Sequence, residues 1–172
     1  MPSIGIYSYE LYHFFGVERI IRVGTIGAMQ PDIPPYDIIV GASASTNSNF
    51  LSQYNLPGTF APTASWPLLN AVTTVAAERA IPIHVGNILS SDTFYSADET
   101  ATARWAGMGV LGVEMESAAL YATAAYAGKQ ALGIFTVADN VVTGAITTPQ
   151  ERQTAFTQMI ELALAVALTP IS

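Results

Sequence analysis

The feature that most constrains this chain is an unbroken apolar run at residues 131–138, ALGIFTVA. A strand with one face in water alternates apolar and polar residues, and this run does not. Such a run is typical of a strand covered on both faces, as in the middle of a parallel sheet. Ligands bind at the carboxyl ends of strands in sheets of this kind. Asp139, which directly follows the run, is therefore the first candidate for chemistry.

Segments with strand and helix character alternate along the rest of the chain. Further strands are predicted at 19–24, 37–44, 82–89 and 110–115. Helices are predicted at 3–15, 66–79, 97–108, 116–127 and 148–168, with a long polar surface loop at 45–65. The first helix has Ile4, Tyr7, Leu11 and Phe14 or Phe15 on one face. This alternation predicts an α/β fold with a mixed, mostly parallel sheet, formed as a single domain over residues 1–172.

Composition excludes several classes of function. The formal charge is −7 and only six residues are basic, which argues against binding to nucleic acid. Without cysteine there is no disulfide or thiolate chemistry, and the two histidines, His13 and His84, are too far apart for metal-ligand spacing. No signal peptide or membrane span is evident, so a cytoplasmic protein is expected. Apolar residues make up 51% of the chain and charged ones 11%, which suggests that other subunits cover part of the surface.

Arg22 precedes a glycine-bounded segment, Gly24-Thr25-Ile26-Gly27, which is expected to turn the chain after the first strand. A guanidinium, a hydroxyl and free backbone amides placed in this way can bind one anion. The alternative is an ordinary tight turn with a surface arginine, and short glycine turns are common. The segment alone does not decide between them.

Two further strand ends carry candidate binding residues. Phe94 and Tyr95 follow the strand at 82–89 and could stack on a planar base, or they could pack in the core. Glu114 and Glu116 flank the end of the strand at 110–115 and can diverge if the strand ends between them. A carboxylate that accepts two hydrogen bonds suits the cis-diol of a ribose. A glutamate at a helix start is an equally good explanation, because the helix dipole favours negative charge there.

Asp139 lies at the tip of the most apolar strand. Partial burial would raise its pKa and allow it to carry a proton near neutral pH. The alternative is an Asx turn that closes the strand. Arg152, in the first turn of the last predicted helix, opposes the helix dipole, which can indicate a functional demand. A surface charge pair with Glu151 is the alternative there.

Together these segments resemble the hexameric, bacterial-type purine nucleoside phosphorylases. The matching stretches are IIRVGTIGA at 20–28, SSDTFYS at 90–96, GVLGVEMESAALY at 109–121, ALGIFTVAD at 131–139 and TPQERQTAFTQMI at 148–160. They follow the family's order and cover essentially the whole chain. The resemblance implies a three-layer α/β/α fold. It also implies reversible phosphorolysis of purine ribo- or deoxyribonucleosides by a pentosyltransferase, with inorganic phosphate as co-substrate and no cofactor or metal.

The resemblance also implies a role for each matching residue. Arg22 and Thr25 correspond to phosphate-binding groups, and Glu116 to the acceptor of the ribose hydroxyls. Phe94 corresponds to the aromatic ring that stacks on the base, and Val113 and Met115 to residues that line the pocket. Asp139 corresponds to the general acid at purine N7, and Arg152 to the arginine that polarises it.

The chain departs from the family pattern in two places. Ala138 stands where the family usually has serine. The family also carries an N-terminal segment of several strands before the point that aligns with Met1, and this segment supplies further phosphate ligands. On the sequence as given, we expect an N-terminally shortened fold, a half-built phosphate site, and a homo-oligomer of non-standard assembly. Two alternatives follow: a nucleoside hydrolase that uses water in place of phosphate, and a truncated purine-binding protein with little or no turnover.

Overall fold

The computed structural model describes residues 1–148, 150 and 156–170. Its strands are β1 (Arg19–Ala28), β2 (Ile38–Thr46), β3 (Ile83–Ser90), β4 (Gly112–Glu114) and β5 (Gln130–Asn140). Its helices are α1 (Pro2–Phe14), the short 3-10 helix η1 (Phe50–Tyr54), α2 (Trp66–Glu78), α3 (Ala101–Gly107), α4 (Ser117–Ala127) and α6 (Thr157–Leu168). The predicted element order is confirmed. The predicted single helix at 148–168 is wrong, since Thr148 is not helical, Phe156 lies in a turn and α6 begins at Thr157. Arg152 lies outside the described residues.

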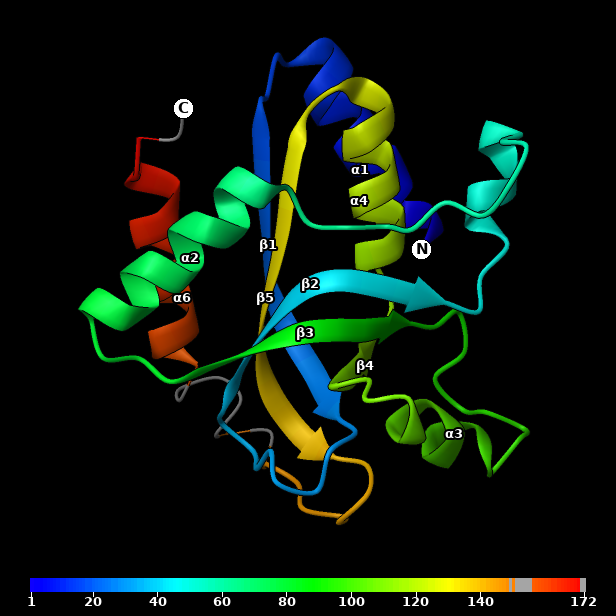
Figure 1. Cartoon of the computed structure of the whole chain (residues 1–172), viewed down its shortest axis with the longest axis vertical. Helices are drawn as coiled ribbons and strands as arrows, with labels where there is room; N and C mark the ends of the chain where they lie inside the picture. Colours follow the sequence, from blue (N-terminus) through cyan, green and yellow to red (C-terminus); the bar gives the residue numbers. More distant parts are fainter. Residues whose placement is uncertain (149, 151–155, 171–172) are drawn as a thin grey trace.

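The strands form one mixed sheet that closes on itself in the order β1-β4-β3-β2-β5. The long pairings, β1 with β5 and β2 with β3, are parallel (Figure 1). Short antiparallel pairings of β2 with β5 and of β1 with β4, and a short parallel pairing of β3 with β4, complete the ring. The mixed, mostly parallel sheet is therefore as predicted. Its closure was not predicted, because it depends on the first half of β2 pairing with β3 and β5 at once.

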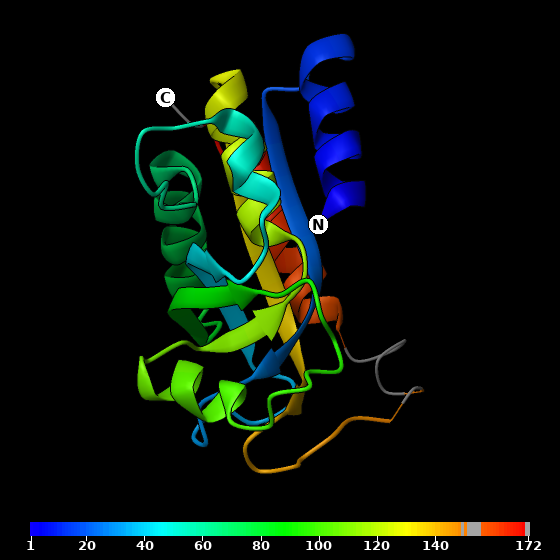
Figure 2. The same ribbon diagram turned by 90° about the vertical axis from the view of Figure 1, so that its right-hand side faces the viewer.

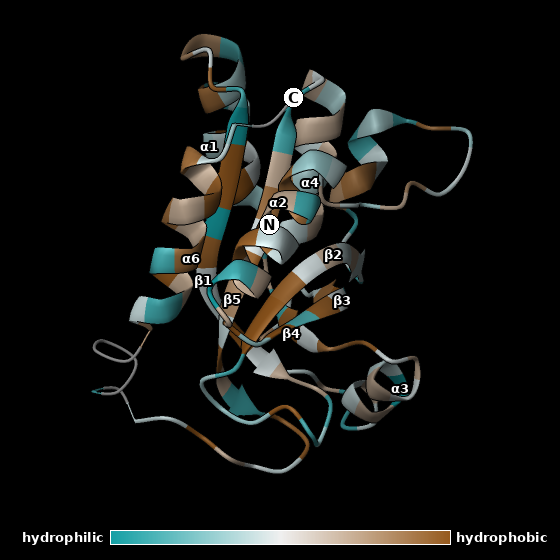
Figure 3. Ribbon diagram, turned by 60° about the vertical axis from the view of Figure 1, so that its left-hand side comes forward, coloured by the Kyte–Doolittle hydropathy of each residue, from teal (hydrophilic) through white to brown (hydrophobic). Residues whose placement is uncertain are grey.

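Helices cover the sheet on two sides (Figures 1 and 2). On one side α1 packs on α4, which contacts β2 and β5, and on the other α2 packs on α6, which contacts β1 and β5. The strand β5 lies between them, and every residue from Ala131 to Ala138 is buried. This confirms the interpretation of the apolar run. Figure 3 shows hydrophobic residues along much of β1 and the first part of β2.

The first helix buries a different face from the one its apolar spacing suggested. Ser8 and Tyr12 are buried, while Tyr7 and Phe14 are more than 60% exposed. The Tyr12 hydroxyl donates to the Gln130 carbonyl, 2.8 Å away, and so ties the helix to the start of β5. Periodicity locates an apolar stripe but does not say whether the core or another surface covers it.

Near their carboxyl ends β1 and β5 shift register by one residue. Ile26 pairs with Val137, whereas Gly27 pairs with Asp139, so Ala138 is an extra residue on β5. A bulge of this kind bends a strand and redirects the side chains that follow it. It places Asp139 opposite Gly27. A Cβ atom at Gly27 would lie 3.2 Å from Asp139 Oδ2, so the glycine leaves room for this carboxylate.

Candidate functional site

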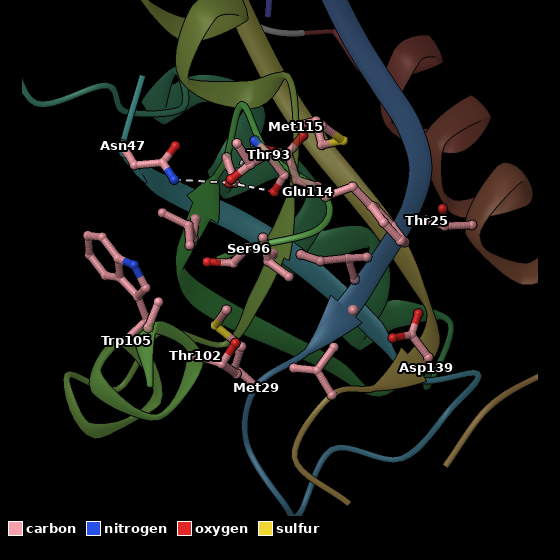
Figure 4. A pocket seen from close by; sticks show the side chains of 18 of the residues that line it. Thr25, Met29, Asn47, Thr93, Ser96, Thr102, Trp105, Glu114, Met115 and Asp139 are labelled. Carbon is pink, nitrogen blue, oxygen red and sulfur yellow. Dashed lines mark hydrogen bonds between the residues drawn. The ribbon is translucent and has the colours of Figure 1, made fainter. Parts of the chain in front are cut away.

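A cavity of about 510 Å³ lies beside the carboxyl-terminal halves of β1, β3, β4 and β5, with α3 forming one wall (Figure 4). This volume suits a small-molecule ligand. Glu114 lines the cavity, and so do seven residues to which the resemblance gives a role: Arg22, Thr25, Phe94, Val113, Met115, Glu116 and Asp139. They come from four separate segments of the chain. The eighth predicted residue, Arg152, is not among the described residues.

Arg22 lies within β1 and not beside a turn, because β1 continues to Ala28. The predicted turn at 24–27 is therefore wrong: these residues pair with β5. Gly24 makes room for the Arg22 side chain, because a Cβ atom at this position would lie 2.8 Å from Arg22 Nη1. Glycine within a strand commonly marks such a close approach. It gives the guanidinium room to turn along the strand.

The Arg22 guanidinium lies between two carboxylates. Its Nη2 donates a hydrogen bond to Glu116 Oε2, and its Nη1 lies 3.6 Å from Glu114 Oε2. Its Cζ lies 5.0 Å from the centroid of the Phe135 ring, within range of a cation–π interaction. Nη1 is buried and has no hydrogen-bond acceptor among the described residues. The site therefore holds a cation that is largely shielded from solvent and contacts charges of the opposite sign.

Glu114 and Glu116 diverge because β4 ends at Glu114 and α4 begins at Ser117. The Glu114 side chain is 1% exposed, whereas that of Glu116 is 34% exposed. Glu114 points to the helix start and accepts backbone hydrogen bonds there. Both glutamates line the cavity, but Glu116 is the more accessible of the two to a ligand. The helix-start alternative is therefore confirmed for Glu114, while binding of a ribose diol by Glu116 stays a prediction.

Aromatic side chains form the more open part of the cavity wall. Phe94 is 77% exposed and meets Tyr95 edge to face, with ring centroids 5.0 Å apart. The core-packing alternative for these two rings is therefore wrong. Trp105 of α3 also lines the cavity, and it packs against a small cluster that contains Met29 and Leu89. Sequence reasoning missed Trp105 because nothing in the predicted helix marked which of its faces meets the strands.

Asp139 is partly buried at the end of β5. The next residue, Asn140, makes the turn that closes this strand: its Oδ1 accepts hydrogen bonds from the backbone of Val142 and Thr143, both at 2.9 Å. Asn140 Nδ2 also donates to the carbonyls of Gln30 and Ile33. The Asx-turn role that was the alternative for Asp139 therefore belongs to Asn140. The hydrogen bonds of the Asn140 side chain therefore restrain the end of β5, where Asp139 lies.

Two other features are absent from the described part of the chain. No group of three or more His, Cys, Asp or Glu residues there could hold a metal ion. His84 Nε2 instead lies 2.8 Å from Asp37 Oδ2, and His13 Nδ1 lies 3.0 Å from the Tyr9 carbonyl oxygen. Within the same residues, no helix is both long and apolar enough to cross a membrane.

Comparison with known proteins gives a consistent result. The family described as "Phosphorylase superfamily" matches residues 1–171. A "Purine nucleoside phosphorylase DeoD-type" of Alkaliphilus metalliredigens is 48% identical over 168 residues, which are 97% of this chain and 72% of that protein. The protein of the same name from Geobacillus sp. (strain WCH70) is 47% identical over 98% of this chain and 71% of its own length. That from Clostridium beijerinckii is 48% identical over 95% and 69%.

Proposed function

Since this chain belongs to the phosphorylase superfamily, we propose that it is a purine nucleoside phosphorylase. It transfers the ribosyl or deoxyribosyl group of a purine nucleoside to inorganic phosphate, and the reaction is reversible. The names of its relatives support this assignment. The structural observation that carries it is one cavity that brings together a buried arginine, an accessible glutamate and a strand-end aspartate. These are groups suited to an anion, a sugar diol and a leaving base.

In the proposed reaction Arg22 and Thr25 hold the phosphate, and Glu116 accepts hydrogen bonds from the ribose hydroxyls. Phe94 stacks on the base, while Val113 and Met115 line the space around the base and the sugar. Holding both reactants in one cavity converts an encounter in solution into a step within a complex. Arg22 keeps the nucleophile in place and stabilises the negative charge of phosphate near the anomeric carbon.

Asp139 is the proposed general acid. As the bond between the anomeric carbon and purine N9 breaks, the electron pair moves into the base, and Asp139 donates a proton to N7. A phosphate oxygen then forms the new bond to the anomeric carbon. Arg152, which is outside the described residues, is proposed to polarise Asp139. Inorganic phosphate is the co-substrate, and we expect no cofactor to be required.

We also propose that the protein works as a homo-oligomer. Around α1 several large apolar side chains are more than half exposed: Ile6, Tyr7, Phe14, Phe15 and, on α4, Tyr126. Exposed apolar patches of this kind commonly mark interaction surfaces. Light scattering coupled to size-exclusion chromatography should give a mass above that of one chain, and a monomeric mass at micromolar concentration would contradict this part of the proposal.

The main proposal is tested by incubating the protein with inosine in the presence and absence of phosphate. Free base and ribose 1-phosphate should form together and only when phosphate is present. Release of base that ignores phosphate would point instead to a nucleoside hydrolase. Binding of inosine without any release of base would point to a purine-binding protein without turnover.

A further inference from the structure

Glu114 is a buried carboxylate for which the proposed reaction has no use. It ends β4, and its side chain is 1% exposed. A charge in such a position is costly unless hydrogen bonds or an ion pair compensate for it. Its surroundings therefore indicate what it does.

The hydrogen bonds of Glu114 tie its carboxylate to the first residues of α4. The backbone N–H of Ser117 lies 3.0 Å from both carboxylate oxygens, and the N–H of Glu116 lies 3.0 Å from Oε2. Ser90 Oγ donates to Oε1 and in turn accepts the N–H of Ala118 at 2.9 Å. The first N–H groups of a helix have no partner within the helix, and the dipole there favours a negative charge. Glu114 and Ser90 satisfy three consecutive donors.

These contacts occupy most of the acceptor capacity of Glu114. A carboxylate has about four acceptor positions. Ser90 Oγ takes one, the Glu116 N–H takes another, and the N–H of Ser117 is shared between both oxygens. The Arg22 guanidinium closes the remaining side, 3.6 Å from Oε2.

We infer that Glu114 is a positioning residue of the site, with Ser90 as the group that orients it. It acts through two neighbours. By fixing the backbone of Glu116 it sets where that carboxylate enters the cavity, and by its charge it confines the guanidinium of Arg22. The inference rests on the proposed function for the identity of the substrates, while the contacts themselves are independent of it.

The test compares Glu114→Gln with Tyr121→Phe. The amide keeps the shape of the side chain, but it loses the charge and turns an N–H₂ toward donors. Tyr121 is equally buried on α4 and its hydroxyl also makes two hydrogen bonds, to Gly41 and Gly133, so its variant is the structural control. We expect kcat/KM for inosine to fall about tenfold to a hundredfold in Glu114→Gln, as for a misplaced reactant. In Tyr121→Phe it should change less than about twofold at a temperature where both variants are folded.

Two further measurements separate positioning from other roles. In a Glu116→Gln background, Glu114→Gln should cost less than it does alone, because the part of its effect that passes through Glu116 is already lost. An equal cost in both backgrounds would show that Glu114 acts independently of Glu116 and would overturn the inference. Equal losses in Glu114→Gln and Tyr121→Phe would overturn it as well.

The inference can also be judged if the proposed function fails. Amide hydrogen exchange by NMR should show that residues 116–118 lose protection in Glu114→Gln and keep it in Tyr121→Phe. Unchanged protection in Glu114→Gln would overturn the positioning role whatever the enzyme does. Absence of base release by the wild-type protein, with the expected exchange result, would overturn only the assigned reaction.

Discussion

Arg22 donates a hydrogen bond to Glu116 although the two residues are 94 positions apart in the chain. Arg22, which is proposed to bind phosphate, and Glu116, which is proposed to bind the ribose, thus form an ion pair with each other. Phosphate must compete with Glu116 for Arg22, and the nucleoside must compete with Arg22 for Glu116. Once one ligand has separated the pair, the partner residue is free to bind the other ligand, so phosphate and nucleoside should bind cooperatively.

The first prediction concerns phosphate affinity. Glu116→Gln should bind phosphate about three- to tenfold more tightly than the wild type when no nucleoside is present, because Arg22 no longer has to leave a charged partner. Isothermal titration calorimetry with phosphate measures this directly. Asp139→Asn is the control, since it replaces another carboxyl group of the same cavity without removing the Arg22–Glu116 pair. Equal tightening in both variants would assign the effect to loss of any carboxyl group from the cavity.

The second prediction concerns the acid. Asp139→Asn should lower kcat for inosine by about 10²–10⁴-fold, the range of general acid catalysis, because the amide cannot deliver a proton to N7. An N7-methylated purine nucleoside provides the matched comparison, since its base departs without protonation at that atom. The variant should lose much less activity on this substrate. A similar loss on both substrates would mean that Asp139 does not act as the acid at N7.

The third prediction concerns the space beside that acid. Gly27→Ala should lower kcat about tenfold, because the added Cβ would lie 3.2 Å from both Asp139 Oδ2 and Val141 Cγ1 and would displace the carboxylate. Steady-state kinetics with inosine checks this. Gly58→Ala is the control, since a Cβ atom there meets nothing within 4 Å. Full activity in Gly27→Ala would show that the carboxylate tolerates a shift.

The fourth prediction concerns stability. The Tyr121 hydroxyl donates to the Gly41 carbonyl at 2.6 Å and accepts the Gly133 N–H at 2.9 Å, so it joins α4 to β2 and β5. Tyr121→Phe leaves both backbone groups buried without this partner and should lower the free energy of unfolding by about 1–3 kcal/mol. Urea denaturation at neutral pH measures the loss. A change below about 0.5 kcal/mol would contradict the assigned role.

The same tyrosine should make stability depend on pH in alkaline solution. Burial raises the pKa of Tyr121 well above its ordinary value of 10.0, so the folded state keeps the phenol neutral where the unfolded state ionises. The folded state then binds more protons than the unfolded state above about pH 10. The free energy of unfolding is therefore unaffected by this group below about pH 10 and decreases as the pH rises further. Burial also raises the pKa of Tyr12 in the same direction. Tyr121→Phe should therefore show a shallower loss of stability above pH 10 than the wild type, though not a flat one.

Much of the fold could be predicted because the spacing of apolar residues along the chain agrees with the residues that are buried. The apolar run of β5 is buried on both sides of the sheet, and the candidate residues at strand ends share one cavity. Gly24 and Gly27 predict a turn that the structure does not have, because sequence does not distinguish a glycine that frees the backbone from one that makes room for a side chain. Periodicity predicts the wrong buried face of α1 for a related reason, since it does not identify the element that packs against the helix.

The roles of the two glutamates could not be separated from sequence. Their separation depends on β4 being only three residues long and on α4 starting immediately after it. The Arg22–Glu116 contact likewise arises from the pairing of β1 with β4 and β5. Contacts between segments this distant are set by topology, and a local motif records only the residue types.

The extra residue on β5, Ala138, limits how the sequence can change during evolution. Exchanging the side chain at this position leaves the bulge in place, whereas deleting the residue would put β1 and β5 in step throughout and would remove the bend that the bulge gives to the strand just before Asp139. Natural variation should therefore accept exchanges of small residues at position 138 and reject changes in length between the apolar run and the aspartate. In this segment the number of residues should therefore matter as much as the identity of the acid that follows it.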